Sequence, residues 1–486
     1  MMAPLKVLLT VHQFFPRDYH GTERYTLDLA TALARAGHKV VILTANQFPE
    51  DSTGEDVIEY EYDSLRVLAI DLVQNKRLEF NASYSRPDLN DLFARILLQE
   101  RPDVVHCAHL LFLGVSFLDV AQRTGCPIVL TMTDFFGICW TNKLLTGAGK
   151  ECSGPDRKNN NCLRDVLGSL SISHPDPVIR FAVRTMQRLP FTTPFMEVIM
   201  RVRFSNNNWH ATLIDGIRER RGIIEASYRH VDHFIVATSV LERKYREHGL
   251  RNRMISRLPF GITQPSSEEH ALLRTRYEKL RSTDRPLVFG FIGQIARHKG
   301  VDLLVRAFVT AQPANTELHV VGNLRQDPVL TDELKAIAHN QDKVKFLPPF
   351  VTSEIYHVLA KVDILVLPSI WSENAPLILL NCLASRTLVA ASDVAGMTEL
   401  IKPEKTGLIF VAKSSEAIAE TLTRAALLRP MLLDLFDSHP GYQISPTIYA
   451  EQVAKIYELE LKKRSRPWNE FALERIAASS SARPVT

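Results

Sequence analysis

The sequence has few cysteines, no long apolar run and no large excess of one charge. No uninterrupted apolar stretch approaches the roughly 18 residues that a membrane-spanning helix needs. The formal charge is only +4 over 486 residues, which disfavours a nucleic-acid-binding protein, whose basic surface would dominate the count. Six cysteines in so long a chain do not make a disulfide framework. We therefore expect a reducing compartment and a cytoplasmic protein.

Several signatures of cofactor and metal sites are missing as well. No G-x-G-x-x-G motif is followed by a ribose-binding acid, so a dehydrogenase is disfavoured. The stretch TGAGKE (146–151) lacks the upstream glycine and the following Ser or Thr of a P-loop. No two aspartates are separated by a single residue, so the chelating pair of metal-dependent sugar transferases is absent. We expect chemistry that needs no metal and no cofactor.

What is present predicts a multidomain α/β protein. A chain of 486 residues that is 45% hydrophobic is expected to fold into two or three globular domains. Short, continuously apolar runs alternate with amphipathic helical stretches, which is typical of parallel strands covered by helices on both faces. The N-terminal stretch MMAPLKVLLTVHQFFP has no small-residue cleavage site, so we interpret it as the first core strand rather than a signal peptide. The predicted strands are LKVLLTVHQF, HKVVILTA, LRVLAIDL, DVVHCAHL, PIVLTMTD and HFIVATS in a first half, and PLVFGFIG, ELHVVGN, KVKFLPPF, DILVLPS, TLVAASDV and GLIFVA in a second.

The predicted boundary lies in the polar, proline-bounded stretch 258–286. We expect two Rossmann-like doubly wound domains that face each other across a cleft, where ligands bind at the carboxyl ends of the strands. The predicted domains are residues 1–262, with an insertion at 135–231, and residues 263–462. A tail at 463–486 is expected to cross back to the N-terminal domain and to be disordered at its end.

Three loops carry candidate ligand-binding groups. Gly21 precedes an amphipathic helix, where a phosphate could approach backbone N–H groups; a plain tight turn is the alternative. Gly293 ends a strand before the basic loop QIARHKG, which suits a diphosphate but also fits a solvated loop. In SENAPLILLNCLASR (372–386), a helix is predicted to start at about Pro376. Glu373 lies beside that start, and its simplest role is to complement the helix dipole, worth about 0.3–1 kcal/mol.

In this order and spacing, the motifs resemble a known family. HGTERYTLDLATALARAGHKV, PDVVH, RHVDHFIVATS, FIGQIARHKGVDLLVRAF, VDILVLPS, SENAP and VAGMTELI resemble retaining glycosyltransferases of family 4, which have the GT-B architecture of two Rossmann-like domains. The resemblance covers roughly residues 4–462 and is weakest in the insertion. It implies transfer of a sugar from a nucleotide-sugar donor to a hydroxyl acceptor, with bacterial surface polysaccharide or glycolipid assembly as the context by analogy.

The resemblance also implies roles for individual residues. Glu373 is expected to contact the donor sugar near its anomeric carbon, and Asn381 to take the position that binds the ribose hydroxyls. Lys299 and the helix-start amides of Leu377 and Ile378 are expected to bind the diphosphate, which Gly21 approaches from the other domain. The acceptor is expected near His109 and Asp134. The predicted donor set is completed by Gly293, Gln294, Asn374, Ala375 and Pro376.

Three positions depart from the family pattern, and they bear on donor affinity. Asn381 replaces a second Glu, Gln294 replaces an arginine of the phosphate loop, and Thr133 stands where a His-Asp pair is common, with Asp134 kept. Two rival functions follow: a catalytically silent homologue acting as a binding or scaffold subunit, and a nucleotide-sugar epimerase. An epimerase would convert a nucleotide sugar without any acceptor.

The insertion holds two further features. Cys139, Cys152 and Cys162 would supply three of the four ligands of a zinc site, but without a C-x-x-C pair buried reduced thiols are the favoured interpretation. The stretch 177–204 carries five arginines against one acid, Glu197. Such a basic, Phe- and Met-rich segment predicts peripheral contact with the inner membrane face; a solvated face over a second core helix is an equal alternative.

Overall fold

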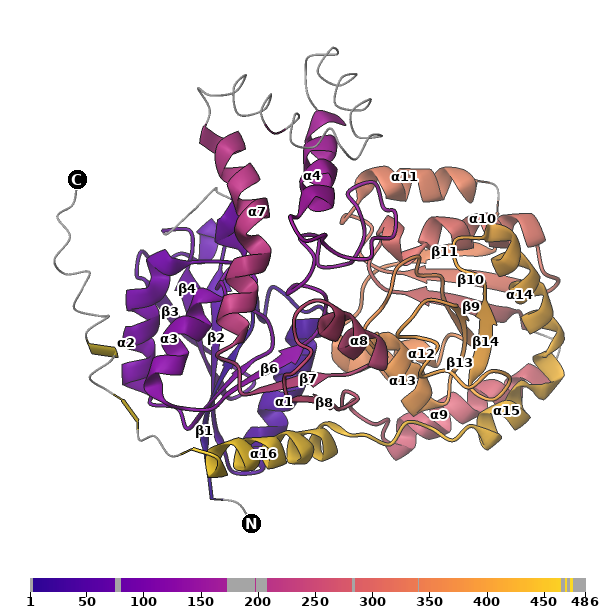
Figure 1. Ribbon diagram of the computed structural model, residues 1–486. Coiled ribbons are helices and arrows are strands. Elements are labelled where there is room, and N and C mark those ends of the chain that lie inside the picture. The colour runs from indigo at the N-terminus through magenta and orange to yellow at the C-terminus, as the bar shows by residue number, and fades with distance from the viewer. Residues whose placement is uncertain are drawn as a thin grey trace. The chain divides into compact units, whose positions relative to one another are not determined.

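The chain folds into two compact units. Unit 1 comprises residues 1–237, 241–258 and 447–486, and unit 2 comprises residues 238–240 and 259–446. Figure 1 labels most of their helices and strands. The computed structural model describes residues 3–74, 80–172, 197, 208–281, 285–339, 341–464, 468–469 and 473–474.

Unit 1 is built on a sheet in the order β3-β4-β2-β1-β5-β6-β7-β8. Every pair is parallel except β3 and β4, which form an antiparallel edge. The sequence-based strands did not include β3 and β8. Residues of β3 alternate between half-buried and exposed, so β3 lacks the continuous apolar run used to find the others. The strands are β1 (Lys6–Thr10), β2 (Lys39–Asn46), β3 (Val57–Tyr62), β4 (Leu65–Asp71), β5 (Val104–Cys107), β6 (Ile128–Met132), β7 (His233–Val236) and β8 (Ile255–Arg257).

Helices of unit 1 follow the strands as the apolar spacing predicts. In α1, the residues Leu29 and Leu33 recur at helical spacing and are buried. In the insertion, α4 and α7 bury a small apolar cluster of their own, which includes Leu167 and Ile214. The helices are α1 (Gly21–Arg35), α2 (Asn90–Glu100), α3 (Ser116–Ala121), α4 (Asn160–Ile172), α7 (Asn208–Tyr228), α8 (Ser239–Glu247) and α16 (Pro446–Lys462).

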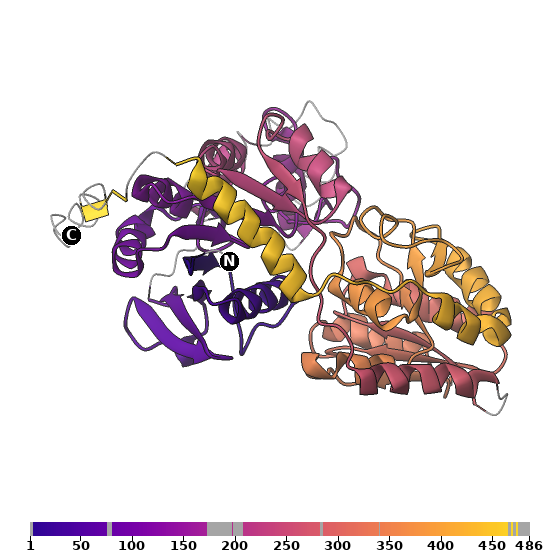
Figure 2. The same cartoon turned by 90° about the horizontal axis from the view of Figure 1, so that it is seen from below.

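Helix α16 belongs with unit 1, although 188 residues of chain, 259–446, separate it from the rest of that unit. The sequence-based boundary placed residues up to 462 in the C-terminal domain, whereas the crossing back begins at Thr447. Buried polar contacts anchor the helix: the Tyr449 hydroxyl lies 3.0 Å from that of Tyr25, and the Tyr457 hydroxyl lies 2.6 Å from His106 Nδ1. Figure 2 shows α16, in yellow, lying along unit 1.

We expect Tyr457→Phe to lower the free energy of unfolding by about 1–3 kcal/mol, because it leaves a buried imidazole nitrogen without a partner. The other nitrogen of His106, Nε2, already contacts Thr131 Oγ1 at 2.8 Å. Burial lowers the pKa of His106 to about 3, so the ring stays neutral and cannot offset the loss by gaining a proton. Chemical denaturation measures the change. The control is Glu451→Ala at an exposed position of α16, expected within about 0.5 kcal/mol of wild type; equal losses in both variants would contradict the prediction.

Unit 2 is a fully parallel sheet in the order β11-β10-β9-β12-β13-β14, with helices along the chain between the strands. All six strands predicted for the second half are present. They are β9 (Leu287–Ile292), β10 (Thr316–Val321), β11 (Val344–Leu347), β12 (Ile364–Leu367), β13 (Leu388–Ser392) and β14 (Gly407–Phe410). The helices are α9 (Ser267–Glu278), α10 (Val301–Ala311), α11 (Pro328–Ile337), α12 (Ile355–Leu359), α13 (Leu377–Ser385), α14 (Ser415–Leu427) and α15 (Leu432–Ser438).

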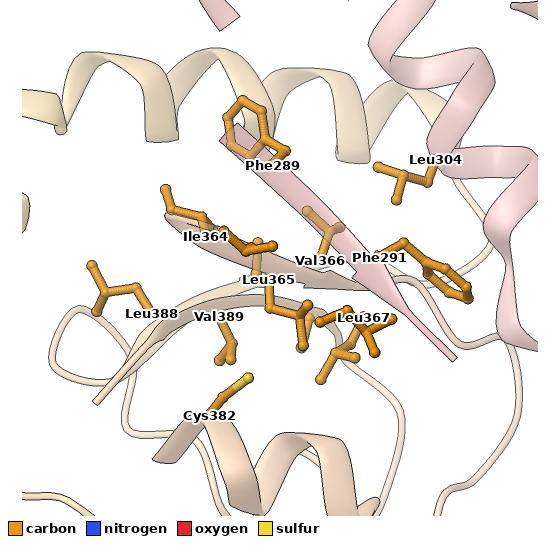
Figure 3. Close-up of a cluster of buried hydrophobic side chains, with 14 of the residues drawn as sticks. Phe289, Phe291, Leu304, Ile364, Leu365, Val366, Leu367, Cys382, Leu388 and Val389 are labelled. Atoms are coloured by element: carbon orange, nitrogen blue, oxygen red, sulfur yellow. The ribbon is translucent and has the colours of Figure 1, made fainter. Parts of the chain in front are cut away.

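The strands of unit 2 have continuously apolar sequences because both faces of the sheet are buried in its core. Every residue of β9, β12 and β13 is buried. Figure 3 shows side chains of these three strands together with Leu304 of α10 and Cys382 of α13. A sheet covered in this way on both faces offers a ligand only its edges and strand ends.

Each sheet has one point at which the strand order reverses. In unit 1 the order runs outward in both directions from between β1 and β5, and in unit 2 from between β9 and β12. Ligands of such sheets bind beyond the carboxyl ends of the strands at this point. Ligand-binding residues are therefore expected in the loops after β1 and β5 in unit 1 and in the loops after β9 and β12 in unit 2.

Candidate functional site

The loop after β9 carries the basic residues and is held close to the loop after β12. Arg297–Lys299 form a short 3₁₀ turn that ends at Gly300. Gly300 has φ +68°, and a Cβ there would lie 2.0 Å from the carbonyl oxygen of Pro368. The Ile370 N–H donates to the His298 carbonyl at 3.0 Å. Glycine is thus required where the two loops meet.

The loop after β12 positions Glu373 through its backbone. The Glu373 N–H donates to the Ala395 carbonyl at 3.0 Å. Gly396 follows with φ +89°, and a Cβ there would lie 1.7 Å from the Glu373 carbonyl oxygen. The glycine of the VAGMTELI motif therefore serves the site, because it lets a neighbouring loop approach the glutamate.

Glu373 is buried, with 5% of its surface exposed, and the Oε1 atom of its side chain receives three hydrogen-bond donors. Lys299 Nζ lies 2.7 Å away, Ser369 Oγ 2.7 Å away and Trp371 Nε1 2.9 Å away. The structure thus brings together Lys299 and Glu373, which the sequence placed 74 residues apart. The sequence analysis did not predict a role for Ser369 or Trp371. The one feature that could have indicated it was their position between a buried strand and Glu373.

Helix α13 begins beside this carboxylate. Its first residue is Leu377 and its N-cap residue is Pro376, one residue later than predicted. Ala375 has φ +48°, a left-handed conformation that is uncommon for alanine and recurs at functional sites. The N–H groups of the first helical turn have no acceptor within the helix. Those of Leu377 and Ile378 are therefore suited to an anion.

Asn381 lies one turn into the same helix and is largely buried, with 9% of its surface exposed. Its Oδ1 atom accepts a hydrogen bond from the Tyr356 hydroxyl of α12 at 3.3 Å. The same hydroxyl contacts the carbonyl oxygen of Thr263. The amide is held in place, and its NH₂ group remains as a donor.

The remaining residues of the basic loop point in different directions. Arg297 pairs with Glu333 of α11 at 2.6 Å, and the His298 ring packs edge-on against Trp371 with centroids 5.6 Å apart. Gly293 follows the last residue of β9 and donates its N–H to the Val321 carbonyl at 3.1 Å; Gln294 follows it. Among the described residues of this loop, Arg297 and Lys299 are the two cations, and Lys299 is the one that pairs with Glu373.

In unit 1, His109 and Asp134 meet at the carboxyl ends of β5 and β6. His109 Nε2 lies 3.2 Å from Asp134 Oδ2, and His109 Nδ1 accepts the Leu111 N–H at 3.1 Å. The Nε2 atom of His109 therefore carries the proton and donates it to the carboxylate. At the start of α1, no described atom outside its chain neighbours lies within 4 Å of a Cβ built on Gly21.

A second pair in unit 1 was missed from the sequence. His12, after β1, has its Nε2 3.3 Å from Glu23 Oε1 in the first turn of α1, and its ring centroid lies 4.4 Å from that of His109. Burial raises the pKa of Glu23 to about 7 and lowers that of His12 well below its ordinary value. Both shifts favour the uncharged forms in this contact, a protonated carboxyl and a neutral imidazole. Glu23 belongs to the HGTER motif, which could have indicated this pair, but only Gly21 of that motif was predicted to have a role.

The insertion yields a packed helix pair and free thiols. Cys139 is buried, Cys152 and Cys162 are half-buried, and all three are free. Burial raises the pKa of Cys162 to about 12. Within the described residues, no group of three His, Cys, Asp or Glu side chains is arranged to hold a metal ion, and no helix is long and apolar enough to cross a bilayer. The basic stretch 177–204 lies outside the described residues, apart from Glu197, which pairs with Arg218 at 2.6 Å.

Two family models match the chain, one in each unit. Residues 275–435 match the model described as glycosyl transferases group 1, and residues 19–142 match that described as glycosyltransferase family 4. The first matched region contains Lys299, Glu373 and Asn381; the second contains Gly21, His109 and Asp134.

Curated relatives and solved structures agree with these matches. The chain is 33% identical over 139 residues to the lipopolysaccharide core biosynthesis mannosyltransferase LpcC of Rhizobium leguminosarum bv. viciae, covering 27% of this chain and 39% of that protein. It is 30% identical over 145 residues to the D-inositol 3-phosphate glycosyltransferase of Mycobacteroides abscessus, covering 28% and 32%. The chain thus spans less than half of the length of these relatives.

The likeness to solved structures extends over nearly the whole chain. Sucrose-phosphate synthase from Thermosynechococcus elongatus matches with a TM-score of 0.63 at 16% identity, covering 95% of this chain and all of that one. Anabaena Alr3699/HepE in complex with UDP-glucose matches with a TM-score of 0.56 at 13% identity, covering 94% and 100%. At these identities the likeness shows the fold.

Proposed function

The chain belongs to glycosyltransferase family 4 and has the two α/β units of the GT-B fold; from this premise we propose that it moves a sugar from a nucleotide-sugar donor to a hydroxyl acceptor. The observation that carries the proposal is the 2.7 Å contact between Lys299 and Glu373 at the strand-order reversal of unit 2. A cation for a diphosphate and a carboxylate for sugar hydroxyls lie side by side, next to the start of α13.

The roles follow from the chemistry of each group. Lys299 and the helix-start amides of Leu377 and Ile378 bind the diphosphate, because both supply positive potential to its oxygens. Glu373 contacts the sugar near its anomeric carbon. Asn381 hydrogen-bonds the ribose through its NH₂ group.

Unit 1 supplies the acceptor side of the proposal. His109 and Asp134 lie at the carboxyl ends of parallel strands, where such sheets bind ligands. Gly21 has neither a positive φ nor a neighbouring atom that a Cβ would meet, so the fold alone does not explain a glycine at this position. This supports a close approach of the donor to the start of α1.

The proposed reaction retains the configuration of the donor sugar. The bond between the anomeric carbon and the diphosphate oxygen breaks, and the leaving group keeps the electron pair. The acceptor oxygen bonds to the same face of the anomeric carbon, and its proton passes to the departing diphosphate. Lys299 and the amides of α13 stabilise the charge that develops on that leaving group, so no metal is invoked.

A panel of nucleotide sugars tests the proposal. Thermal shift identifies the donor that binds, and product analysis with that donor and sugar or lipid-linked acceptors detects transfer, with the anomeric configuration read by NMR. Conversion of the donor without acceptor would favour the epimerase. Absence of both transfer and slow donor hydrolysis would favour a silent binding subunit and contradict the proposal.

We expect Asn381→Glu to lower the donor KM five- to tenfold and to leave kcat nearly unchanged. A hydrogen bond to a charged group contributes about 1.5–3 kcal/mol and a neutral one about 0.5–1.5 kcal/mol, so the exchange gains about 1 kcal/mol in donor binding. Tyr356 can still donate to the new carboxylate. Asn381→Gln is the matched control, because it has the length of glutamate without the charge; an equal gain in Asn381→Gln would contradict the electrostatic reason.

A further inference from the structure

Three donors converge on a single oxygen of the candidate catalytic carboxylate. Glu373 Oε1 receives Lys299 Nζ, Ser369 Oγ and Trp371 Nε1, all within 2.9 Å. An oxygen with three donors has little capacity for a ligand hydroxyl. The other oxygen, Oε2, has no hydrogen-bond partner among the described residues.

Trp371 contacts both members of the Lys299–Glu373 pair. Its indole N–H donates to the carboxylate, and the Lys299 ammonium lies 5.4 Å from the centroid of its ring, within the range of a cation–π interaction. Trp371 is 9% exposed, and its ring packs against the His298 ring in a T-shaped arrangement. One rigid side chain therefore fixes the distance and direction of two charged groups from different loops.

Some hydrogen-bonding groups of Lys299 and Glu373 remain available to a ligand. An ammonium has three donors, and Lys299 uses one of them on Glu373 among the described residues. Two donors of Lys299 and the acceptor Oε2 of Glu373 remain for a ligand. A tryptophan side chain has only two torsions and is already held in place here. Ligand binding therefore loses little conformational entropy in ordering it.

We propose that Trp371 is a positioning residue, which locks Glu373 Oε1 and holds the Lys299 ammonium so that Oε2 faces the donor sugar. The inference rests on the proposed function for its kinetic readout. The contact itself can be tested without turnover.

The first experiment reads the contact directly. The chain has four tryptophans, so the full-length protein labelled with ¹⁵N-tryptophan gives few indole signals, and the Trp371 signal is assigned by its loss in Trp371→Phe. We expect this signal to shift in Glu373→Gln, because its acceptor changes from a carboxylate to an amide, and to shift again when UDP is added. A Trp371 signal that does not move in Glu373→Gln overturns the inference, whether or not the wild type is active.

The second experiment separates the two contacts by kinetics. Trp371→Phe keeps an aromatic face for Lys299 but removes the N–H donor; we expect kcat to fall about ten- to a hundredfold, with UDP affinity within twofold of wild type. Trp371→Met removes both contacts, and we expect UDP affinity to fall as well, at least threefold. If both variants keep wild-type kcat, or if Trp371→Phe changes only the melting temperature, Trp371 is structural and the inference fails.

A control tests whether the effect belongs to this site. Trp140 also donates its indole N–H to a carboxylate, Asp165 Oδ2, at 3.2 Å, but it lies in the insertion of unit 1. Trp140→Phe loses the same kind of bond, and we expect its kcat to match that of wild type. Equal losses of kcat in Trp140→Phe and Trp371→Phe would overturn the assignment of the effect to Glu373.

Discussion

Lys299→Ala is expected to lower kcat about 10²–10³-fold. The departing diphosphate gains charge as the glycosidic bond breaks, and removing one donor aimed at such developing charge costs about this factor. Of the lysine and arginine side chains that the structure describes in this loop, Lys299 pairs with Glu373 and Arg297 pairs with Glu333. No second lysine or arginine of the loop stands ready to replace it.

The measurement is steady-state kcat and KM with the donor identified by thermal shift. Arg297→Ala is the matched control: it removes a cation two residues away that is half exposed and pairs outside the site, so we expect little change in kcat. Near-wild-type turnover in Lys299→Ala would contradict the placement of the diphosphate. Equal losses in both variants would point to damage of the loop rather than to a lost phosphate contact.

Glu373→Gln is expected to lower kcat about 10²-fold and to change the donor KM far less. The amide oxygen of glutamine can still accept from Ser369 and Trp371, so the fold of the loop is kept. Its NH₂ group then replaces Oε2, and the group facing the sugar becomes a donor instead of an acceptor. The negative charge beside the anomeric carbon is also lost, which matters most as the bond breaks.

Product formation under saturating donor measures kcat, and titration with the nucleoside diphosphate of the donor identified by thermal shift measures binding. The comparison variant is Glu373→Asp, which keeps the charge but withdraws it by one methylene; a partial loss is expected. If Glu373→Gln instead raises KM at constant kcat, Glu373 binds ground state and transition state alike. The proposed role near the anomeric carbon would then be wrong.

The fold was predictable where one physical pattern determined each element. Continuous apolar runs identified the six strands of unit 2, because every residue of β9, β12 and β13 is buried. The start of α13 was predictable to within one residue from Pro376, because proline is favoured at a first helical position; in the structure Pro376 is the N-cap. In contrast, β3 is an antiparallel edge strand with an exposed face, and its weaker pattern was overlooked.

The site was predictable only in part, because some of its residues act through tertiary contacts. Lys299 and Glu373 stood out as a cation and a carboxylate near helix starts. Ser369 and Trp371 could not be assigned, since nothing in IWSENAP shows that the indole N–H turns toward the carboxylate. His12 and Glu23 were missed for the same reason, because their contact joins a loop residue after β1 to a residue of α1 eleven positions later. The predicted donor roles of Lys299, Glu373 and the other donor residues, and the predicted acceptor roles of His109 and Asp134, stay predictions.

The path of α16 has a consequence for how the protein is made. Unit 2 is almost wholly contained in the uninterrupted stretch 259–446, whereas unit 1 needs residues from both sides of that stretch. Domains fold as units while the chain is synthesised. The ribosome therefore delivers a complete unit 2 before α16 emerges, and until then His106 lacks its Tyr457 partner. Unit 1 begins before unit 2 in the chain but is completed after it.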